Sequence, residues 1–101
     1  MRKIYKIEEL VKILRPIFEA NCIYKAILFG SYARGEARSN SDIDIVIDSK
    51  GELLNIQFYG VLEDLVEKLK KQVDLFEVSE IKEDSPIYNK IKEEGVLIYE
   101  R

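Results

Sequence analysis

A glycine–serine pair at the end of a short apolar run is the first group of residues in this sequence that could do chemistry. Gly30 and Ser31 follow the apolar residues 26–29, and the polar residues that come next favour a turn. Glycine lets backbone amides approach a phosphate without steric conflict. Amides at the start of a helical turn offer hydrogen-bond donors and a partial positive charge to an anion. The pair is therefore a candidate phosphate-binding loop, to which the Ser31 hydroxyl adds one donor.

Two aspartates form the second group. Ten residues separate Ser31 from Asp42, and a single isoleucine separates Asp42 from Asp44. In a strand these two side chains point to the same face, about 7 Å apart at the backbone. Carboxylates this close repel each other unless one is protonated or a cation bridges them. Magnesium prefers oxygen ligands and is the natural bridge between carboxylates and a triphosphate. The two groups together predict an enzyme that handles a nucleoside triphosphate with magnesium.

A third acidic residue, Asp74, lies within the otherwise apolar run 73–76. A buried carboxylate needs a partner, and a shared metal ion would supply one. In a two-metal site a third carboxylate can hold the second metal and act on the attacking hydroxyl group. Asp74 is therefore the candidate third ligand. The alternative is a structural carboxylate that is satisfied by hydrogen bonds.

Arg34 lies close to Ser31 in the chain and could make charge-assisted hydrogen bonds to a phosphate. It could equally form a salt bridge with Glu36 or Asp42, which would leave it no role in ligand binding. The residue pattern leaves both interpretations open. We expect the nearby Tyr32 to pack against other side chains rather than to stack on a nucleotide base.

The elements that must position these groups follow from the spacing of apolar residues. Steps of three and four predict amphipathic helices, and short apolar runs predict strands. We expect a first helix over 7–20, a short helical turn over 31–35, and longer helices over 53–71 and 86–94. We expect strands over 23–29, 42–47, 73–78 and 96–99. This order predicts an α/β fold in one compact domain over 1–101.

Composition excludes several classes of protein. The chain has 101 residues and a net charge of −3, so no overall basic field indicates general nucleic-acid binding. It contains no histidine, which excludes histidine-based acid–base catalysis and histidine-ligated zinc within the chain. The apolar runs are too short to cross a bilayer, and the N-terminal residues lack the features of a signal peptide. The single cysteine, Cys22, cannot form an internal disulfide, so we expect a cytoplasmic protein in which Cys22 is buried.

The stretch Gly30-Ser31-Tyr32-Ala33-Arg34-Gly35, followed by Ser41-Asp42-Ile43-Asp44, resembles the signature of the polymerase-beta-type nucleotidyltransferase superfamily. The small size and this form of the motif are most similar to the minimal nucleotidyltransferases, the MNT antitoxins of bacteria and archaea. The resemblance covers essentially the whole chain, and Asp74 falls where the family keeps its third carboxylate. It implies a nucleotidyltransferase-type α/β (α+β) fold, with a small mixed sheet of about four strands and flanking helices.

The resemblance also implies roles for individual residues. The nucleotide would be ATP, bound by Gly30, Ser31, Arg34 and Ser41. Two magnesium ions would be held by three catalytic carboxylates, Asp42, Asp44 and Asp74. Of these, Asp74 would be the best placed to accept the proton of the attacking hydroxyl group. Taken by itself, Ser41 could instead cap the turn into the strand and orient Asp42.

Similarity to the minimal family implies transfer of AMP from ATP to a hydroxyl group, with release of pyrophosphate. The implied acceptor is a tyrosine of a HEPN-domain toxin, bound in a heteromeric complex. The chain would then be the antitoxin of a type VII-like toxin–antitoxin pair. Two alternatives stay open. One is a non-catalytic antitoxin that blocks its partner sterically, and the other is a transferase whose small-molecule or nucleic-acid acceptor is bound by a separate chain. A homodimer is compatible with each of them.

Overall fold

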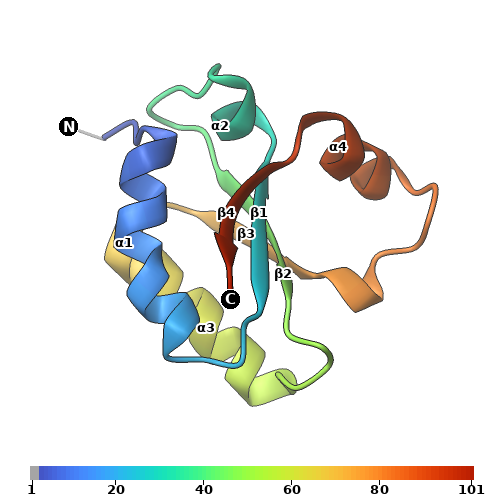
Figure 1. Ribbon diagram of the computed structural model, residues 1–101. Coiled ribbons are helices and arrows are strands. Elements are labelled where there is room, and N and C mark those ends of the chain that lie inside the picture. The colour runs from blue at the N-terminus through green and yellow to red at the C-terminus, as the bar shows by residue number, and fades with distance from the viewer. Residues whose placement is uncertain (1–2) are drawn as a thin grey trace.

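The computed structural model describes residues 3–101, in which a four-stranded sheet is covered on one face by two long helices (Figure 1). The strands are β1 (Lys25–Phe29), β2 (Ile43–Asp48), β3 (Val73–Glu77) and β4 (Val96–Glu100). The helices are α1 (Ile7–Glu19), α2 (Ser31–Arg34), α3 (Asn55–Leu69) and α4 (Pro86–Glu94), with a 3-10 helix, η1, at Val78–Glu80. Within these residues no helix is long and apolar enough to cross a membrane.

The sheet is mixed, with the strand order β3-β2-β1-β4. Strand β1 is antiparallel to both of its neighbours, whereas β2 and β3 are parallel and α3 makes the crossover between them. The register places Phe29 opposite Asp44, and Asp44 opposite Asp74. The predicted α/β fold with a mixed four-stranded sheet is confirmed, and the end of β1 lies next to Asp44 in β2, which in turn lies next to Asp74 in β3.

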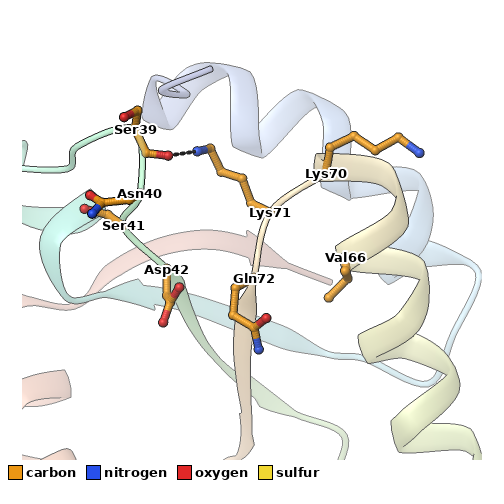
Figure 2. A pocket seen from close by; sticks show the side chains of 8 residues that line it. All are labelled: Ser39, Asn40, Ser41, Asp42, Val66, Lys70, Lys71 and Gln72. Atoms are coloured by element: carbon orange, nitrogen blue, oxygen red, sulfur yellow. Dashed lines mark hydrogen bonds between the residues drawn. The ribbon is translucent and has the colours of Figure 1, made fainter. Parts of the chain in front are cut away.

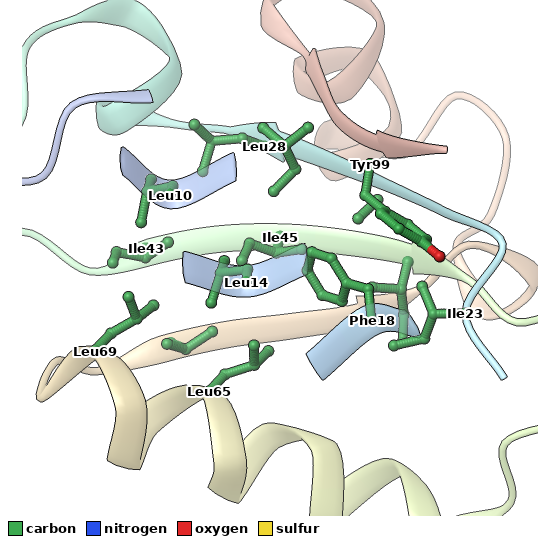
Figure 3. Packing of buried hydrophobic residues seen from close by; sticks show 14 of the residues in the cluster. Leu10, Leu14, Phe18, Ile23, Leu28, Ile43, Ile45, Leu65, Leu69 and Tyr99 are labelled. Atoms are coloured by element: carbon green, nitrogen blue, oxygen red, sulfur yellow. The ribbon is translucent and has the colours of Figure 1, made fainter. Parts of the chain in front are cut away.

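The core lies between the sheet and the pair α1 and α3 (Figure 3). Its buried residues include Leu10, Leu14 and Phe18 of α1, Ile43, Ile45 and Ile47 of β2, and Leu65 and Leu69 of α3. Because side chains alternate along a strand, burying these isoleucines turns Asp44 and Val46 to the opposite face. A slip of one residue in β2 would exchange the two faces. The core therefore fixes the register, and the register fixes the position of Asp44.

The second face of the sheet is only partly covered, by an aromatic pair and by α4. The rings of Phe29 and Phe76 lie 5.9 Å apart. Helix α4 begins at Pro86, and the Ser85 side chain accepts a hydrogen bond from the backbone N–H of Tyr88, which caps the helix. A Cβ atom on Gly95, just after the helix, would lie 2.8 Å from Cγ2 of Ile27 in β1. The end of α4 is therefore packed closely against the sheet beside the acidic residues.

Every predicted helix and strand is present, with bounds within two residues of those expected. The 3-10 helix η1 was not predicted. Tyr32 is buried, as expected. The expectation that Cys22 is buried was wrong, because Cys22 is exposed in the turn after α1 and its neighbour Ile23 takes the buried position instead.

Candidate active site

Two of the three predicted carboxylates lie together on neighbouring strands. Asp44 in β2 lies directly opposite Asp74 in β3, so both side chains project from the same face of the sheet. Both side chains are half-buried, whereas Asp42, which precedes β2 by one residue, is exposed. Among residues 3–101, no three acidic or cysteine side chains are arranged so that they could hold a metal ion. The structure thus assembles the pair Asp44 and Asp74 and leaves Asp42 at the rim.

The electrostatics of Asp44 fit a site for a cation. The pKa of Asp44 is raised from 3.8 to about 6, first by burial and then by the neighbouring carboxyls of Asp74 and Asp42, against a weaker opposing effect of Lys90. An acid in this position is costly to ionise unless positive charge is supplied. A divalent cation bound beside the two carboxyls would supply that positive charge. The carboxylate oxygens of Asp44 and Asp74 are the kind of ligand that magnesium prefers.

Gly30 lies directly against this pair. It is buried, and its φ of +79° and ψ of −159° belong to a region of backbone conformation that is essentially restricted to glycine. A Cβ atom at this position would lie 2.1 Å from Oδ2 of Asp44, which is far inside any permitted contact. Glycine is therefore required both by the backbone conformation and by the close approach of the carboxylate. Ser31 follows it as the half-buried first residue of α2.

Arg34 is held by two carboxylates. Its Nε donates to Oε1 of Glu36 at 2.8 Å, and its Nη1 donates to Oε2 of Glu94 at 2.9 Å. Of the two sequence-based interpretations, the structure shows the salt bridge, with Glu36 rather than with Asp42 as one of the partners. Binding of a phosphate by Arg34 stays a prediction, and it would require at least one of these contacts to be exchanged.

Ser41 makes a local contact. Its hydroxyl accepts a hydrogen bond from the backbone N–H of Arg38 at 2.8 Å, which closes the loop that leads into β2. This is the capping role that the sequence allowed, and it fixes the residue immediately before Asp42. A role for Ser41 in nucleotide binding stays a prediction.

Helix α4 contributes two charged residues that sequence reasoning missed. Glu94 accepts a hydrogen bond from the backbone N–H of Gly30 at 3.0 Å, in addition to its contact with Arg34. The charge of Lys90, one helical turn earlier, lowers the pKa of Asp44 and so opposes part of its rise. The only signal in the sequence was this spacing of four residues on one helix. It could not show that the helix end returns to a glycine 64 positions away.

A pocket of about 360 Å³ opens beside Asp42, between the loop that leads into β2 and the end of α3 (Figure 2). It is lined by Ser39, Asn40, Ser41, Asp42, Val66, Lys70, Lys71 and Gln72. Lys71 is largely buried and its Nζ donates to the carbonyl oxygen of Ser39 at 2.9 Å, whereas the Lys70 side chain points away (Figure 2). Val66 is the one apolar residue of this lining, so the pocket offers hydrogen-bonding groups next to Asp42.

Two relatives from Methanocaldococcus jannaschii are similar to this chain in sequence. Both are named "Putative protein adenylyltransferase". The first, MJ0435, is 34% identical over 76 residues, which cover 74% of this chain and 81% of the relative. The second, MJ1215, is 36% identical over 77 residues, which cover 74% of this chain and 88% of the relative.

Solved structures of toxin–antitoxin complexes contain chains with a similar fold. A chain of a toxin–antitoxin crystal structure with AMP-PNP has a TM-score of 0.74 and 25% identity, covering 96% of this chain and 75% of that one. A chain from the Shewanella oneidensis complex of a tri-AMPylated HEPN toxin with MNT antitoxin has a TM-score of 0.65 and 22% identity. The alignment covers 94% of this chain and 70% of that one.

The family model described as polymerase beta, nucleotidyltransferase matches residues 12–101, which include every candidate site residue. The predicted enzyme class, a nucleotidyltransferase, is confirmed by this match and by the two relatives. Since the match runs from within α1 through β4, it covers the whole sheet and all of the loops around the carboxylates. The chain belongs to the polymerase beta nucleotidyltransferase family.

Proposed function

We propose that this chain is a magnesium-dependent protein adenylyltransferase, which transfers AMP from ATP to a hydroxyl group of a partner protein. The observation that carries the proposal is the pairing of Asp44 with Asp74 directly beside Gly30, in a pair of strands that the core holds in register. The names of the two archaeal relatives support a protein acceptor. The AMP-PNP in a structurally similar complex supports ATP as the donor.

The residues have separate tasks in this proposal. Gly30 and Ser31 bind the triphosphate through backbone and hydroxyl donors, and Arg34 adds a charge-assisted contact once it leaves one of its carboxylate partners. Asp44 and Asp74 would hold magnesium together with the exposed Asp42. Magnesium supplies the positive charge that stabilises the attacking and leaving oxygens.

The reaction is an exchange of one phosphorus–oxygen bond for another. The acceptor oxygen attacks the α-phosphorus of ATP, a new oxygen–phosphorus bond forms, and the bond to the β-phosphate breaks. Pyrophosphate leaves with the electron pair, and the Asp74 carboxylate accepts the proton of the hydroxyl group. The strand register supports this role, because it pairs Asp74 directly with Asp44.

We propose that the partner is a HEPN-domain toxin, that the acceptor is a tyrosine, and that this chain is the antitoxin. Support comes from the similarity in fold to chains of toxin–antitoxin complexes, including one with a tri-AMPylated HEPN toxin.

The test uses the tagged chain to capture partners from its native lysate, followed by magnesium with ATP labelled at the α- or the γ-phosphorus. We expect the label to move to a captured protein only from the α position, with a mass gain of whole AMP units. Asp44→Asn should abolish the transfer. Asp64→Asn is the matched control, because Asp64 is an exposed aspartate of α3. A captured HEPN protein that is neutralised with no gain in mass would instead indicate a sterically blocking antitoxin.

A further inference from the structure

The carboxylate of Glu94 lies on donors that the proposed function assigns to the triphosphate. Oε1 accepts from the backbone N–H of Gly30 at 3.0 Å, and Oε2 accepts from Nη1 of Arg34 at 2.9 Å. Each oxygen of one carboxylate therefore has one donor from the candidate phosphate-binding loop. The Glu94 side chain is 18% exposed, so its carboxylate is partly shielded from solvent.

The contact is electrostatically favourable for an anion. The Arg34 guanidinium, followed by the Gly30 amide, holds the pKa of Glu94 below its usual range, so the carboxylate is ionised at neutral pH. A carboxylate and a phosphate oxygen accept hydrogen bonds from amides and guanidinium groups in the same way. The same two donors cannot serve both anions in full, so Glu94 and a phosphate group compete for them.

The backbone at the end of α4 can stay in place when the Glu94 carboxylate leaves its two donors. A Cβ atom on Gly95 would lie 2.4 Å from the carbonyl oxygen of Ile91 and 2.8 Å from Ile27, so the backbone after the helix has no space to shift inward. The Glu94 carboxylate ends a flexible side chain, and rotation about its own bonds can withdraw it. Competition at this position therefore needs a change of rotamer and no movement of the helix.

We propose that Glu94 is an internal competitor of the nucleotide: its carboxylate occupies the Gly30 and Arg34 donors in the empty site, and ATP must displace it. This inference rests on the proposed function, because it takes the Gly30–Arg34 loop as the triphosphate site. A ligand that offers several phosphate oxygens displaces Glu94 more readily than one that offers few. The contact therefore sets nucleotide affinity and returns to the loop when pyrophosphate leaves.

The test measures binding of magnesium with α,β-methylene ATP, which cannot be cleaved at the α–β bond, by calorimetry and without any partner protein. Glu94→Gln should lower the Kd of the analogue by about three- to tenfold, since one charged contact is removed from the competing side. Glu93→Gln is the matched control: it removes the same charge from the adjacent, exposed residue of the same helix and should leave the Kd close to that of the wild type.

Glu94→Asp distinguishes direct occupation of the Gly30 and Arg34 donors from a long-range effect of the negative charge at position 94. Aspartate keeps the charge but is one methylene shorter, so it should behave like Glu94→Gln if direct contact with Gly30 and Arg34 matters. A Kd that is unchanged or raised in Glu94→Gln, with the wild type binding normally, would overturn the inference and leave the proposed function standing. Absence of binding by the wild type and by all three variants would overturn both. Circular dichroism of each variant shows that it is folded.

Discussion

At Gly30 two independent constraints exclude every other residue type, and they can be separated experimentally. Gly30 and Gly35 both have positive φ angles, +79° and +74°, but only Gly30 has Asp44 in the path of a Cβ atom. Gly35 has nothing within 4 Å. Gly35→Ala therefore reports strain of the left-handed helical region alone, with no clash, which is about 1 to 2 kcal/mol.

We predict that Gly30→Ala lowers the free energy of unfolding by roughly 2 to 4 kcal/mol, because the clash adds to backbone strain in a region that glycine alone adopts. Urea unfolding of the two variants measures the difference directly. Equal losses for Gly30→Ala and Gly35→Ala would contradict the close approach of the Asp44 carboxylate.

The raised pKa of Asp44 predicts a dependence of stability on pH. Its folded-state value is about 6 and its ordinary value is 3.8, so the proton is bound more tightly in the folded chain. The contribution of this group to stability is present in full below pH 3.8 and is lost as the pH rises through about 6. The full shift would correspond to about 3 kcal/mol, which partial exposure of the side chain reduces to about 1 kcal/mol.

Asp44→Asn should accordingly be more stable than the wild type by about 1 kcal/mol at pH 8, in the presence of a chelator, and the difference should vanish near pH 4. Urea unfolding at both pH values measures it, with Asp64→Asn as the control for a general loss of negative charge. A variant that is less stable than the wild type at pH 8 would show that the ionised carboxylate is not destabilising. The same substitution should abolish AMP transfer, so stability and activity would change in opposite directions.

Among single residues, Asp42, Asp44 and Asp74 could be selected from the sequence as candidates, whereas Glu94 could not. Asp42, Asp44 and Asp74 stand out because each interrupts or alternates with apolar residues that a strand must bury. Glu94 is one of several acids on a polar helix, and its contact with Gly30 depends on how α4 returns to the sheet. The partners of Arg34 depend on that same return. Such long-range contacts leave no local pattern.

The helices behave as their apolar periodicity predicts, and this can be checked at two positions of contrasting burial. Leu14 of α1 is fully buried against the sheet, whereas Ile56 of α3 is 88% exposed. We predict that Leu14→Ala lowers the free energy of unfolding by about 2 to 5 kcal/mol. Ile56→Ala should change it by less than about 0.5 kcal/mol. Thermal or urea unfolding compares them, and a large loss at Ile56 would mean that this residue is covered, for example by a second copy or a partner.

Element boundaries were predictable where the sequence carries a strong local signal. The start of α4 at Ser85-Pro86 follows from a capping residue and a proline at the first helical position. Helix α1 follows from its apolar steps of three and four. The 3-10 helix η1 covers only three residues and has no periodicity to detect, so the polar pattern after β3 could not reveal it. The order of the strands in the sheet could not be predicted from the sequence, because the strands have similar apolar patterns that do not indicate which of them pair.

At the scale of the whole molecule, the small size of the domain makes its stability sensitive to ligands. A domain of 101 residues has a narrow stability margin, and a ligand that binds only the folded state adds to it. At a concentration of 100 times its Kd, such a ligand contributes about 2.7 kcal/mol. For a domain of this size that corresponds to a rise in Tm of about 10 °C or more.

We therefore predict that magnesium with α,β-methylene ATP raises the Tm of the wild type by about 10 °C at pH 8, because the cation neutralises Asp44 and Asp74 while the triphosphate takes up the donors of the Gly30 loop. Removing the metal with a chelator should abolish most of the rise. Asp44→Asn should start from a higher Tm without ligand and gain little from it, since the variant has already lost the repulsion that the cation relieves. A rise that persists in Asp44→Asn, or that survives the chelator, would place nucleotide binding away from the carboxylates and would contradict the site proposed for this chain.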